Sequence, residues 1–404
     1  MARWLSDLLD NREKFFPESN WLGWQPMQRE SFSWSLLVNQ PVPILWIKIG
    51  LPPALLIAAL FGGRLLEEMP ALNAEIQAKS VKPIVLQRHR YIADHLYGID
   101  FFDDKHGIST GYYGTVLRTR DGGQNWSWHS TGETQLLRRV HMTSADQAVS
   151  IGHRGAIYRT EKGGSHWQVV HREPDTMLRA VALAEDGSTG WAVGSGAAIL
   201  RTEDSGRNWL RQVLTGYTPR DLPTWNGVAI VDADTVALAG EFGMLAFSSD
   251  GGESWIVKES PTRTTLNDIV VMPGGYLAVG LDGTAVTIAQ QGDDYTLRAL
   301  STGSIEHLFA LSVDADGKGV AVGSRTLLAV SPDGFAAISV SDSVELPYNW
   351  FADIDMTRSG AVWSVGRRGL VAGAPAGGGA FEVLFRLGID TPSNAATSLA
   401  ESES

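Results

Sequence analysis

Apolar and polar residues alternate in short runs over most of the chain after residue 88, and glycine-rich turns separate these runs. In one stretch, the runs 137–142, 148–152, 156–160 and 167–171 each show the alternation of a half-buried strand. Four such strands within about 40 residues form the unit of a β-propeller blade. The pattern therefore predicts an all-β domain.

An apolar-Gly-x-x-Gly/small-apolar element marks seven copies of this unit. Its first glycines are Gly111, Gly152, Gly194, Gly240, Gly280, Gly323 and Gly366, spaced 41, 42, 46, 40, 43 and 43 positions apart. A period of about 40 to 50 residues is typical of propeller blades. The repeats predict a seven-bladed β-propeller over residues 88–390.

A Ser/Thr-x-Asp-x-Gly-x-x-Trp motif, the Asp-box, lies between the third and fourth predicted strands of the early copies. An aspartate can accept hydrogen bonds from backbone N–H groups across a tight turn, and the tryptophan can pack between adjacent blades. The second copy has Lys162 in place of the aspartate, and Tyr295 and Phe381 stand near the tryptophan position in later copies. We expect a structural role for Asp121, Trp126, Trp167, Asp204, Trp209, Asp250 and Trp255.

Residues 41–63 have a different pattern, an apolar run about as long as a helix needs to cross a bilayer. Lys48 is its only charge, and Pro52 and Pro53 should kink the helix. We predict a transmembrane helix with Trp46, Lys48, Pro52 and Pro53 as membrane residues; a buried core helix is the alternative. Forty residues precede the run, more than a cleavable signal peptide has, so we expect an uncleaved anchor.

Residues 1–40 carry four tryptophans, Trp4, Trp21, Trp24 and Trp34. This predicts an amphipathic segment on lipid or on another membrane protein, and a loosely ordered cytoplasmic tail is the alternative. We expect residues 64–87 to be a linker and 391–404 a disordered tail. The predicted location is a bacterial inner membrane, with the N-terminus cytoplasmic and the propeller periplasmic.

Composition narrows the chemistry. The chain has no cysteine, which excludes disulfides, thiolate metal sites and cysteine nucleophiles. Its formal charge of −12 argues against nonspecific binding to nucleic acid. The nine histidines include no H-x-x-x-H pair, so we expect no dedicated metal site and no cofactor.

The combined unit, VGxxGxIxRTxDGGxxW in seven copies, resembles the photosystem II assembly and stability factor family of seven-bladed Asp-box (BNR-like) propellers. The resemblance covers about residues 88–390. It implies a protein that is not an enzyme and that holds a membrane-protein intermediate during assembly. The long N-terminal segment and retained span replace the family's cleavable signal or lipid anchor. We therefore expect a non-photosynthetic bacterial branch, with a polytopic inner-membrane protein such as an RND-type transporter as partner and lipid bound through the N-terminal segment.

Arginine and tyrosine gather on one predicted face. In the strand order above, the Gly-x-x turns share a face, here called the Gly-x-x face, with the loops that precede each innermost strand. Both residue types are frequent interface hot spots. We expect the partner to bind Arg154, Arg325, Arg367, Arg368, Arg138, Arg139, Arg179, Tyr112 and Tyr113, with Trp225 and Trp350 as secondary candidates. Ordinary solvated turn residues are the alternative.

A carbohydrate-binding or sialidase-like propeller is the second predicted function, because sialidases also carry Asp-boxes. No early Arg-Ile-Pro-like motif is present, and seven copies rather than six disfavour a sialidase. A buried arginine–carboxylate–tyrosine cluster in the central channel would favour glycan chemistry. A smooth channel and a charged outer face would favour docking.

Overall fold

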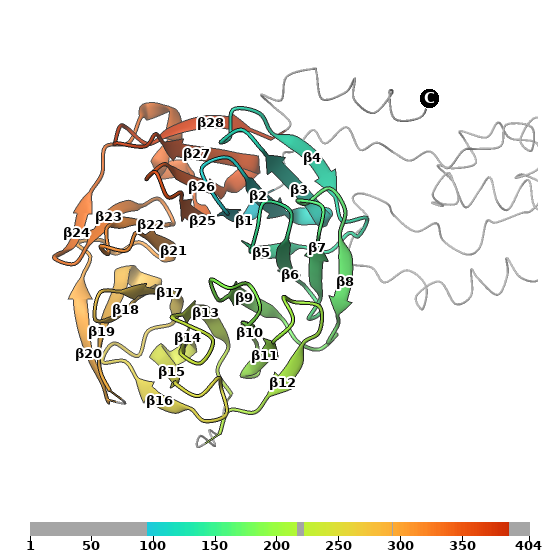
Figure 1. Cartoon of the computed structure of the whole chain (residues 1–404). Helices are drawn as coiled ribbons and strands as arrows, with labels where there is room; N and C mark the ends of the chain where they lie inside the picture. The colour runs from blue at the N-terminus through green and yellow to red at the C-terminus, as the bar shows by residue number, and fades with distance from the viewer. Residues whose placement is uncertain (1–94, 216–221, 293, 388–404) are drawn as a thin grey trace, which may run out of the picture. The chain divides into compact units, whose positions relative to one another are not determined.

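The computed structural model describes residues 95–215, 222–292 and 294–387, which form the ring of seven four-stranded sheets seen in Figure 1. These residues belong to the second of the two units into which the chain divides, Arg90–Ser404. The predicted span at 41–63, the segments 1–40 and 64–87, and the tail 391–404 lie outside the described residues. Within the described ranges, no helix is long and apolar enough to cross a bilayer.

Each sheet is an antiparallel meander of four consecutive strands, and the first strand of each lies nearest the centre of the ring (Figure 1). The seven-bladed propeller predicted from the repeats is thereby confirmed. Blades 1 to 4 are β1 (Leu96–Phe101), β2 (Gly107–Gly111), β3 (Thr115–Thr119), β4 (Ser127–Ser130); β5 (Leu137–Met142), β6 (Ala148–Gly152), β7 (Ile157–Thr160), β8 (Gln168–His171); β9 (Leu178–Leu183), β10 (Gly190–Gly194), β11 (Ala198–Thr202), β12 (Leu210–Gln212); and β13 (Trp225–Ile230), β14 (Val236–Gly240), β15 (Met244–Ser248), β16 (Ile256–Glu259).

Blades 5 to 7 follow the same plan. They comprise β17 (Leu266–Met272), β18 (Gly275–Gly280), β19 (Thr284–Gln291), β20 (Asp294–Ser301); β21 (Leu308–Val313), β22 (Gly319–Gly323), β23 (Leu327–Ser331), β24 (Gly334–Ala337); and β25 (Phe351–Met356), β26 (Val362–Gly366), β27 (Leu370–Ala374), β28 (Glu382–Arg386). Four Gly-x-x turns are 3₁₀ turns, η3 (Tyr112–Gly114), η4 (Glu241–Gly243), η5 (Leu281–Gly283) and η8 (Arg367–Gly369). Two more, η6 (Asp342–Val344) and η7 (Leu346–Tyr348), lie in the long connection from blade 6 to blade 7.

The hydrophobic core lies between adjacent blades. Trp167 of blade 2 packs in one buried cluster with Ile108 and Val116 of blade 1. Blade 5 has no tryptophan at this position, and Tyr295 stacks on Phe247 of blade 4, with ring centroids 3.9 Å apart. Each blade therefore buries an aromatic face against the blade before it, as the repeat pattern requires.

The Asp-box turns have the hydrogen bonds expected of them. In blade 3, Asp204 Oδ1 accepts from the Thr202 hydroxyl at 2.9 Å and from Asn208 N at 2.8 Å. The Trp209 indole N–H donates to Gly206 O at 3.1 Å, which fixes the ring over the turn. Blade 2 keeps the hydroxyl part of this network, because Thr160 Oγ1 still accepts from Gly164 N at 3.2 Å although Lys162 replaces the aspartate.

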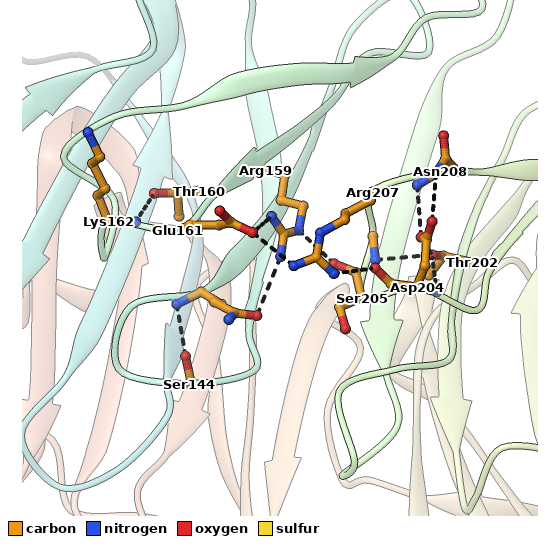
Figure 2. A network of polar contacts seen from close by, with 12 residues as sticks. Ser144, Arg159, Thr160, Glu161, Lys162, Thr202, Asp204, Ser205, Arg207 and Asn208 are labelled. Carbon is orange, nitrogen blue, oxygen red and sulfur yellow. Dashed lines mark hydrogen bonds and ion pairs between the residues drawn. The ribbon is translucent and has the colours of Figure 1, made fainter.

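An arginine joins the Asp-box turns of blades 2 and 3 (Figure 2). Arg159 Nε donates to Ser205 O in blade 3 at 2.7 Å, and its Nη1 pairs with Glu161 at 2.5 Å. Glu161 Oε1 also accepts from Arg207 of blade 3 at 3.0 Å. Arg159 is itself buried, so this pairing gives its charge a partner at the blade interface.

A candidate docking site at the channel mouth

Each of the seven repeat positions requires glycine, because a backbone carbonyl group packs where a Cβ atom would lie. A Cβ on Gly111 would lie 2.5 Å from His95 O, the carbonyl just before β1. The residue after Gly111 donates its N–H to the same carbonyl, since Tyr112 N lies 3.2 Å from His95 O. The same pair of contacts recurs in all seven blades, so each Gly-x-x turn is tied by its backbone to the start of its own blade.

The second residue of each turn adopts a left-handed backbone conformation. Glycine holds this position only in blade 3; the other occupants are Tyr113, Arg154, Phe242, Asp282, Arg325 and Arg368, with φ between 53° and 59°. Left-handed geometry costs an L-residue roughly 1–2 kcal/mol relative to a right-handed one. Because the conformation recurs in all seven blades, the turn itself imposes it, and six blades accept this cost by placing a residue other than glycine at the tip.

A β-bulge re-aims side chains at the start of every innermost strand. The pairing of each innermost strand with the second strand shifts around its second residue. The re-aimed residues are Tyr97, Arg138, Arg179, Asn226, Asn267, Phe309 and Ala352. Asn226 and Asn267 use this position to donate to carbonyls of the next blade, at 3.0 Å and 2.7 Å. The other polar residues at this position, Tyr97, Arg138 and Arg179, form the candidate site.

Arg138 of blade 2 and Arg179 of blade 3 form an arginine pair at the mouth of the central channel. Burial, followed by the charges of Arg179 and Arg139, lowers the pKa of Arg138 to about 10. The Nε atoms of both arginines are buried and have no hydrogen-bond partner. Among the described residues, neither guanidinium forms an ion pair, so the pair is a positive site without a protein counter-ion.

Four aromatic rings stand beside the arginine pair and form what we call the aromatic wall: His95, Tyr97, Tyr112 and Trp350. The Tyr97 and Tyr112 rings meet edge to face at 5.2 Å, and their hydroxyls are hydrogen bonded at 3.3 Å. Burial and this hydrogen bond raise the pKa of Tyr97, whereas the charge of Arg138 lowers it. The mouth thus offers cationic donors next to an apolar surface.

Below the mouth, Arg139 crosses the channel. From blade 2 its guanidinium reaches an ion pair with Asp353 of blade 7, lies 3.7 Å from Asp268 of blade 5, and is 3.4 Å from Phe309 O of blade 6. The side chain is only 15% exposed. Arg139 therefore neutralises buried carboxylates and ties four blades together.

A cavity of about 280 Å³ continues from this level and is lined by polar groups that include Asp100, His141, Asp355 and Arg139. Burial raises the pKa of Asp100 and of Asp355 to about 7, and the charge of Asp100 adds to the effect on Asp355. Burial also lowers the pKa of His141. The residues that the structure describes contain no group of three or more His, Asp or Glu arranged to hold a metal ion.

The nine predicted docking residues lie in three parts of the structure: the channel mouth, the channel interior and the rim. Arg138, Arg179 and Tyr112 lie together at the mouth, and Arg139 lies inside the channel. The remaining five lie on the rim, where Arg325 pairs with Glu306 at 2.9 Å and Arg367 donates to Tyr348 O. Trp350, the secondary candidate, belongs to the aromatic wall, whereas Trp225 is fully buried in the core. His95 and Tyr97 were missed; the bulge position that Tyr97 shares with Arg138 would have identified it.

The channel meets part of the criterion set for glycan chemistry. An arginine and carboxylates lie in it, but the Arg139 guanidinium is already bound by Asp353, and the cavity lining contains no tyrosine. The arginine of a sialidase site must be free to grip a substrate carboxylate. The arginine pair at the mouth, by contrast, has no carboxylate partner within the described ranges.

Comparison with known proteins identifies relatives of this chain. Residues 130–395 match the family model described as photosynthesis system II assembly factor YCF48. The chain is 22% identical over 302 residues to the photosystem II assembly lipoprotein Ycf48 of Synechococcus sp. (strain CC9902), covering 73% of this chain and 77% of the relative.

Two solved structures share the fold. A structure of YCF48 bound to a D1 peptide aligns with a TM-score of 0.54 at 17% identity, over 70% of this chain and 91% of that one. An ancestral GH74 enzyme aligns with a TM-score of 0.55 at 12% identity, over 72% of this chain and 46% of that one. Since the family model covers well over half of the sequence, the chain belongs to the photosynthesis system II assembly factor YCF48 family.

Proposed function

We propose that this chain is a non-catalytic assembly or accessory subunit that docks a membrane-protein partner by binding an acidic peptide segment of it at the channel mouth. The observation that carries the proposal is the arginine pair, Arg138 and Arg179, which are half-buried, lie near each other and have no counter-ion among the described residues. Two like charges in a partly desolvated site destabilise the fold unless a ligand supplies negative charge.

The aromatic wall supports a peptide as that ligand. Tyrosine and tryptophan provide rigid apolar area at little entropic cost, and arginine binds carboxylates through two parallel hydrogen bonds. A relative of the same fold has been solved with a D1 peptide bound. We propose a polytopic inner-membrane protein as the partner, with RND-type transporters as the first class to test, and the propeller on the periplasmic side of an N-terminal anchor.

The test compares partner recovery from gently solubilised native membranes. The wild-type chain and the double variant Arg138→Gln/Arg179→Gln are purified through a C-terminal tag, and co-purifying proteins are quantified by mass spectrometry. We expect a stoichiometric polytopic protein with the wild type and its loss, by tenfold or more, with the variant, because two charge-assisted contacts at about 1.5–3 kcal/mol each disappear.

Arg120→Gln/Arg358→Gln is the matched control, since it removes the same charge from exposed positions on the opposite face. Equal recovery with the control and with the mouth variant would overturn the mouth as the docking site. Charge reversal at Arg154, Arg325, Arg367 and Arg368 then tests whether the rim contributes.

The glycan alternative keeps one specific observation in its favour, the two carboxyls with pKa values near 7 in the channel cavity. Titration with a panel of sialylated and neutral oligosaccharides distinguishes it. Saturable binding that Asp355→Asn abolishes and Arg138→Gln leaves unchanged would place the ligand in the cavity and would count against peptide docking.

A further inference from the structure

The two faces of the propeller carry very different charge. In the described loops of the Asp-box face, which join first to second and third to fourth strands, sixteen carboxylates accompany six lysines and arginines. In the described loops of the Gly-x-x face, eight carboxylates accompany six arginines, and the arginine pair at the mouth adds two more cations. One face is strongly acidic and the other nearly neutral, so an anionic surface would repel the first and admit only the second.

Exposed apolar side chains gather on the same nearly neutral face. Seven large apolar residues in the described ranges are more than half exposed, and five of them lie in loops of the Gly-x-x face. These five are Val213, Leu222, Phe242, Ile305 and Tyr348. Ile305 is 87% exposed, Tyr348 74% and Phe242 57%, and each is in a loop beside a different blade.

Two of the exposed aromatic side chains on this face lie at strained backbone positions. Phe242 and Tyr113 hold left-handed conformations, in which a bulky residue is a clear outlier, and both expose their rings. A glycine there would relieve the strain and remove apolar area from water. The Tyr113 ring lies 6.1 Å from that of Tyr112, whereas Phe242 is 57% exposed, so most of the apolar area of Phe242 is left for something outside the propeller.

Arginines lie among the apolar tips at equivalent positions. Arg154 and Arg368 are exposed and form no ion pair with any described residue, whereas Arg325 is paired with Glu306. Apolar tips in several loops, interspersed with cations and opposite an acidic face, suit a bilayer interface with anionic headgroups better than a protein pocket, which would call for one contiguous apolar patch.

We propose that the Gly-x-x face rests on a lipid bilayer, with the apolar tips in the headgroup region and Arg154 and Arg368 binding lipid phosphates. This contact goes beyond the proposed docking function, because it uses the tips rather than the channel mouth. It places the mouth at the membrane surface, where a loop or terminus of an integral membrane protein emerges.

The absence of cysteine allows a direct test on the full chain. Single variants Phe242→Cys and Ile305→Cys are labelled with a bimane fluorophore and reconstituted into phosphatidylcholine vesicles with or without phosphatidylglycerol. Quenching by brominated lipid reports contact with the bilayer, and quenching by iodide reports exposure to water. Ala376→Cys, an exposed residue in a loop of the Asp-box face, is the matched control.

We expect brominated lipid to quench the tip probes about threefold more than the control probe, and iodide to quench them less, with a larger effect in anionic vesicles. The double variant Arg154→Gln/Arg368→Gln should abolish the dependence on anionic lipid. Equal quenching at all three positions in both vesicle types would overturn the proposal. Tyr348→Cys replaces either tip variant that fails to elute as a monodisperse species.

The two proposals fail separately. Vesicles without any partner protein test the lipid contact alone, whereas recovery of the partner depends on Arg138 and Arg179. A face reserved for protein would leave the tip probes open to iodide in pure lipid vesicles and would still lose its partner when the arginine pair is replaced.

Discussion

Two neighbouring arginines of strand β5 have opposite energetic roles. Arg139 is bound by Asp353 and approaches Asp268, so its charge is compensated inside the channel. Arg138 has no such partner and lies near the charges of Arg139 and Arg179. Of these two adjacent residues, Arg139 stabilises the ring, whereas Arg138 is stabilised only when a ligand supplies negative charge.

Replacement by glutamine should reveal this difference as opposite signs in the free energy of unfolding. Arg138→Gln should raise it by about 1–3 kcal/mol, because a partly buried charge whose pKa is lowered by burial and by two neighbouring arginines is removed. Arg139→Gln should lower it by about 3–5 kcal/mol, because two buried carboxylates lose their cation. Urea denaturation at pH 7 measures both. A loss of stability in both variants would show that Arg138 is structural.

Asp100 and Asp355 make stability depend on pH in an unusual direction. Their pKa values are raised to about 7 in the folded chain, from 3.8 when exposed, so the folded state binds more protons between these values. Their contribution is greatest below pH 4 and is lost as the pH rises toward 7. His141, whose pKa is lowered, acts in the opposite sense and destabilises the fold as the pH falls through 6.5.

Asp355→Asn should therefore stabilise the chain by about 2–4 kcal/mol at pH 8 and by less than about half as much at pH 5, where the folded carboxyl still holds its proton. Chemical denaturation at intervals between pH 5 and 8 measures the difference. Asp333→Asn, at an exposed carboxyl in the turn before β24, is the matched control and should change stability by less than about 0.5 kcal/mol at either pH. An equal effect of Asp355→Asn at both values would contradict a raised pKa.

At the residue scale, the sequence identified both arginines of the mouth and two of the four aromatic residues, Tyr112 and Trp350, but not His95 and Tyr97. Arg138 and Arg179 were found because they begin innermost strands. His95 and Tyr97 contact Trp350 only where the ring closes, across more than 250 positions of sequence. Alternation along one strand contains no information about such a contact.

The Asp-box turns of blades 2 and 3 allow the contribution of one aspartate to the free energy of unfolding to be measured. Blade 3 has the full network of Thr202, Asp204 and Asn208, whereas blade 2 has Lys162 where the carboxylate would be. The backbone of the two turns is otherwise alike, because Gly163 and Gly164 in blade 2 and Ser205 and Gly206 in blade 3 all have positive φ. The two blades are therefore a natural pair for exchanging the aspartate.

Lys162→Asp should raise the free energy of unfolding by about 1 kcal/mol, because a new carboxylate would accept from backbone N–H groups of the turn. Asp204→Ala should lower it by about 1–2 kcal/mol by leaving those donors unpaired. The measurement is the shift in urea midpoint at constant slope. A destabilising effect of Lys162→Asp would contradict the prediction and would indicate repulsion between the new carboxylate and neighbouring Glu161, which pairs with Arg159 and Arg207 (Figure 2).

The pattern of short strands was predictable at this scale because each blade is local in sequence. The connection between blades 6 and 7 was not. Its two 3₁₀ turns, η6 and η7, are held by Asn349, whose side-chain amide donates to Val344 O at 2.6 Å, and by a parallel bridge between Val340 and Phe381. Neither contact belongs to a repeat, so period and alternation give no signal for it.

For the whole molecule, the closure of the ring is the decisive feature. Every blade is built from four consecutive strands, so no strand is exchanged between blade 7 and blade 1. Carboxylates of β25 bridge the seam instead: Asp353 accepts from Ile99 N at 3.0 Å, and Asp355 from Phe101 N at 2.8 Å. Trp363 adds apolar contact by stacking on Phe101, with centroids 5.2 Å apart.

Two tryptophans at the same repeat position allow the seam to be compared with an ordinary interface. Trp363→Ala should open blades 1 and 7 locally, because no peptide connection joins them there, and raise amide hydrogen exchange in β1 and β26. Trp191→Ala, between covalently linked blades, should cost about 3–5 kcal/mol of global stability without selective exchange. Hydrogen exchange with mass spectrometry separates the two outcomes. Identical exchange patterns would mean that the seam is as strong as the other interfaces.

The Gly-x-x turns have a consequence for how such a protein diversifies. Each turn is fixed by a glycine and a backbone hydrogen bond, and neither depends on the side chain at the tip. The residues at the seven turn tips can therefore be substituted without disturbing the propeller scaffold. Descendants of one ancestral ring could acquire new clients through a few codon changes. Grafting the tips of one family member onto another would be the corresponding route for an engineer.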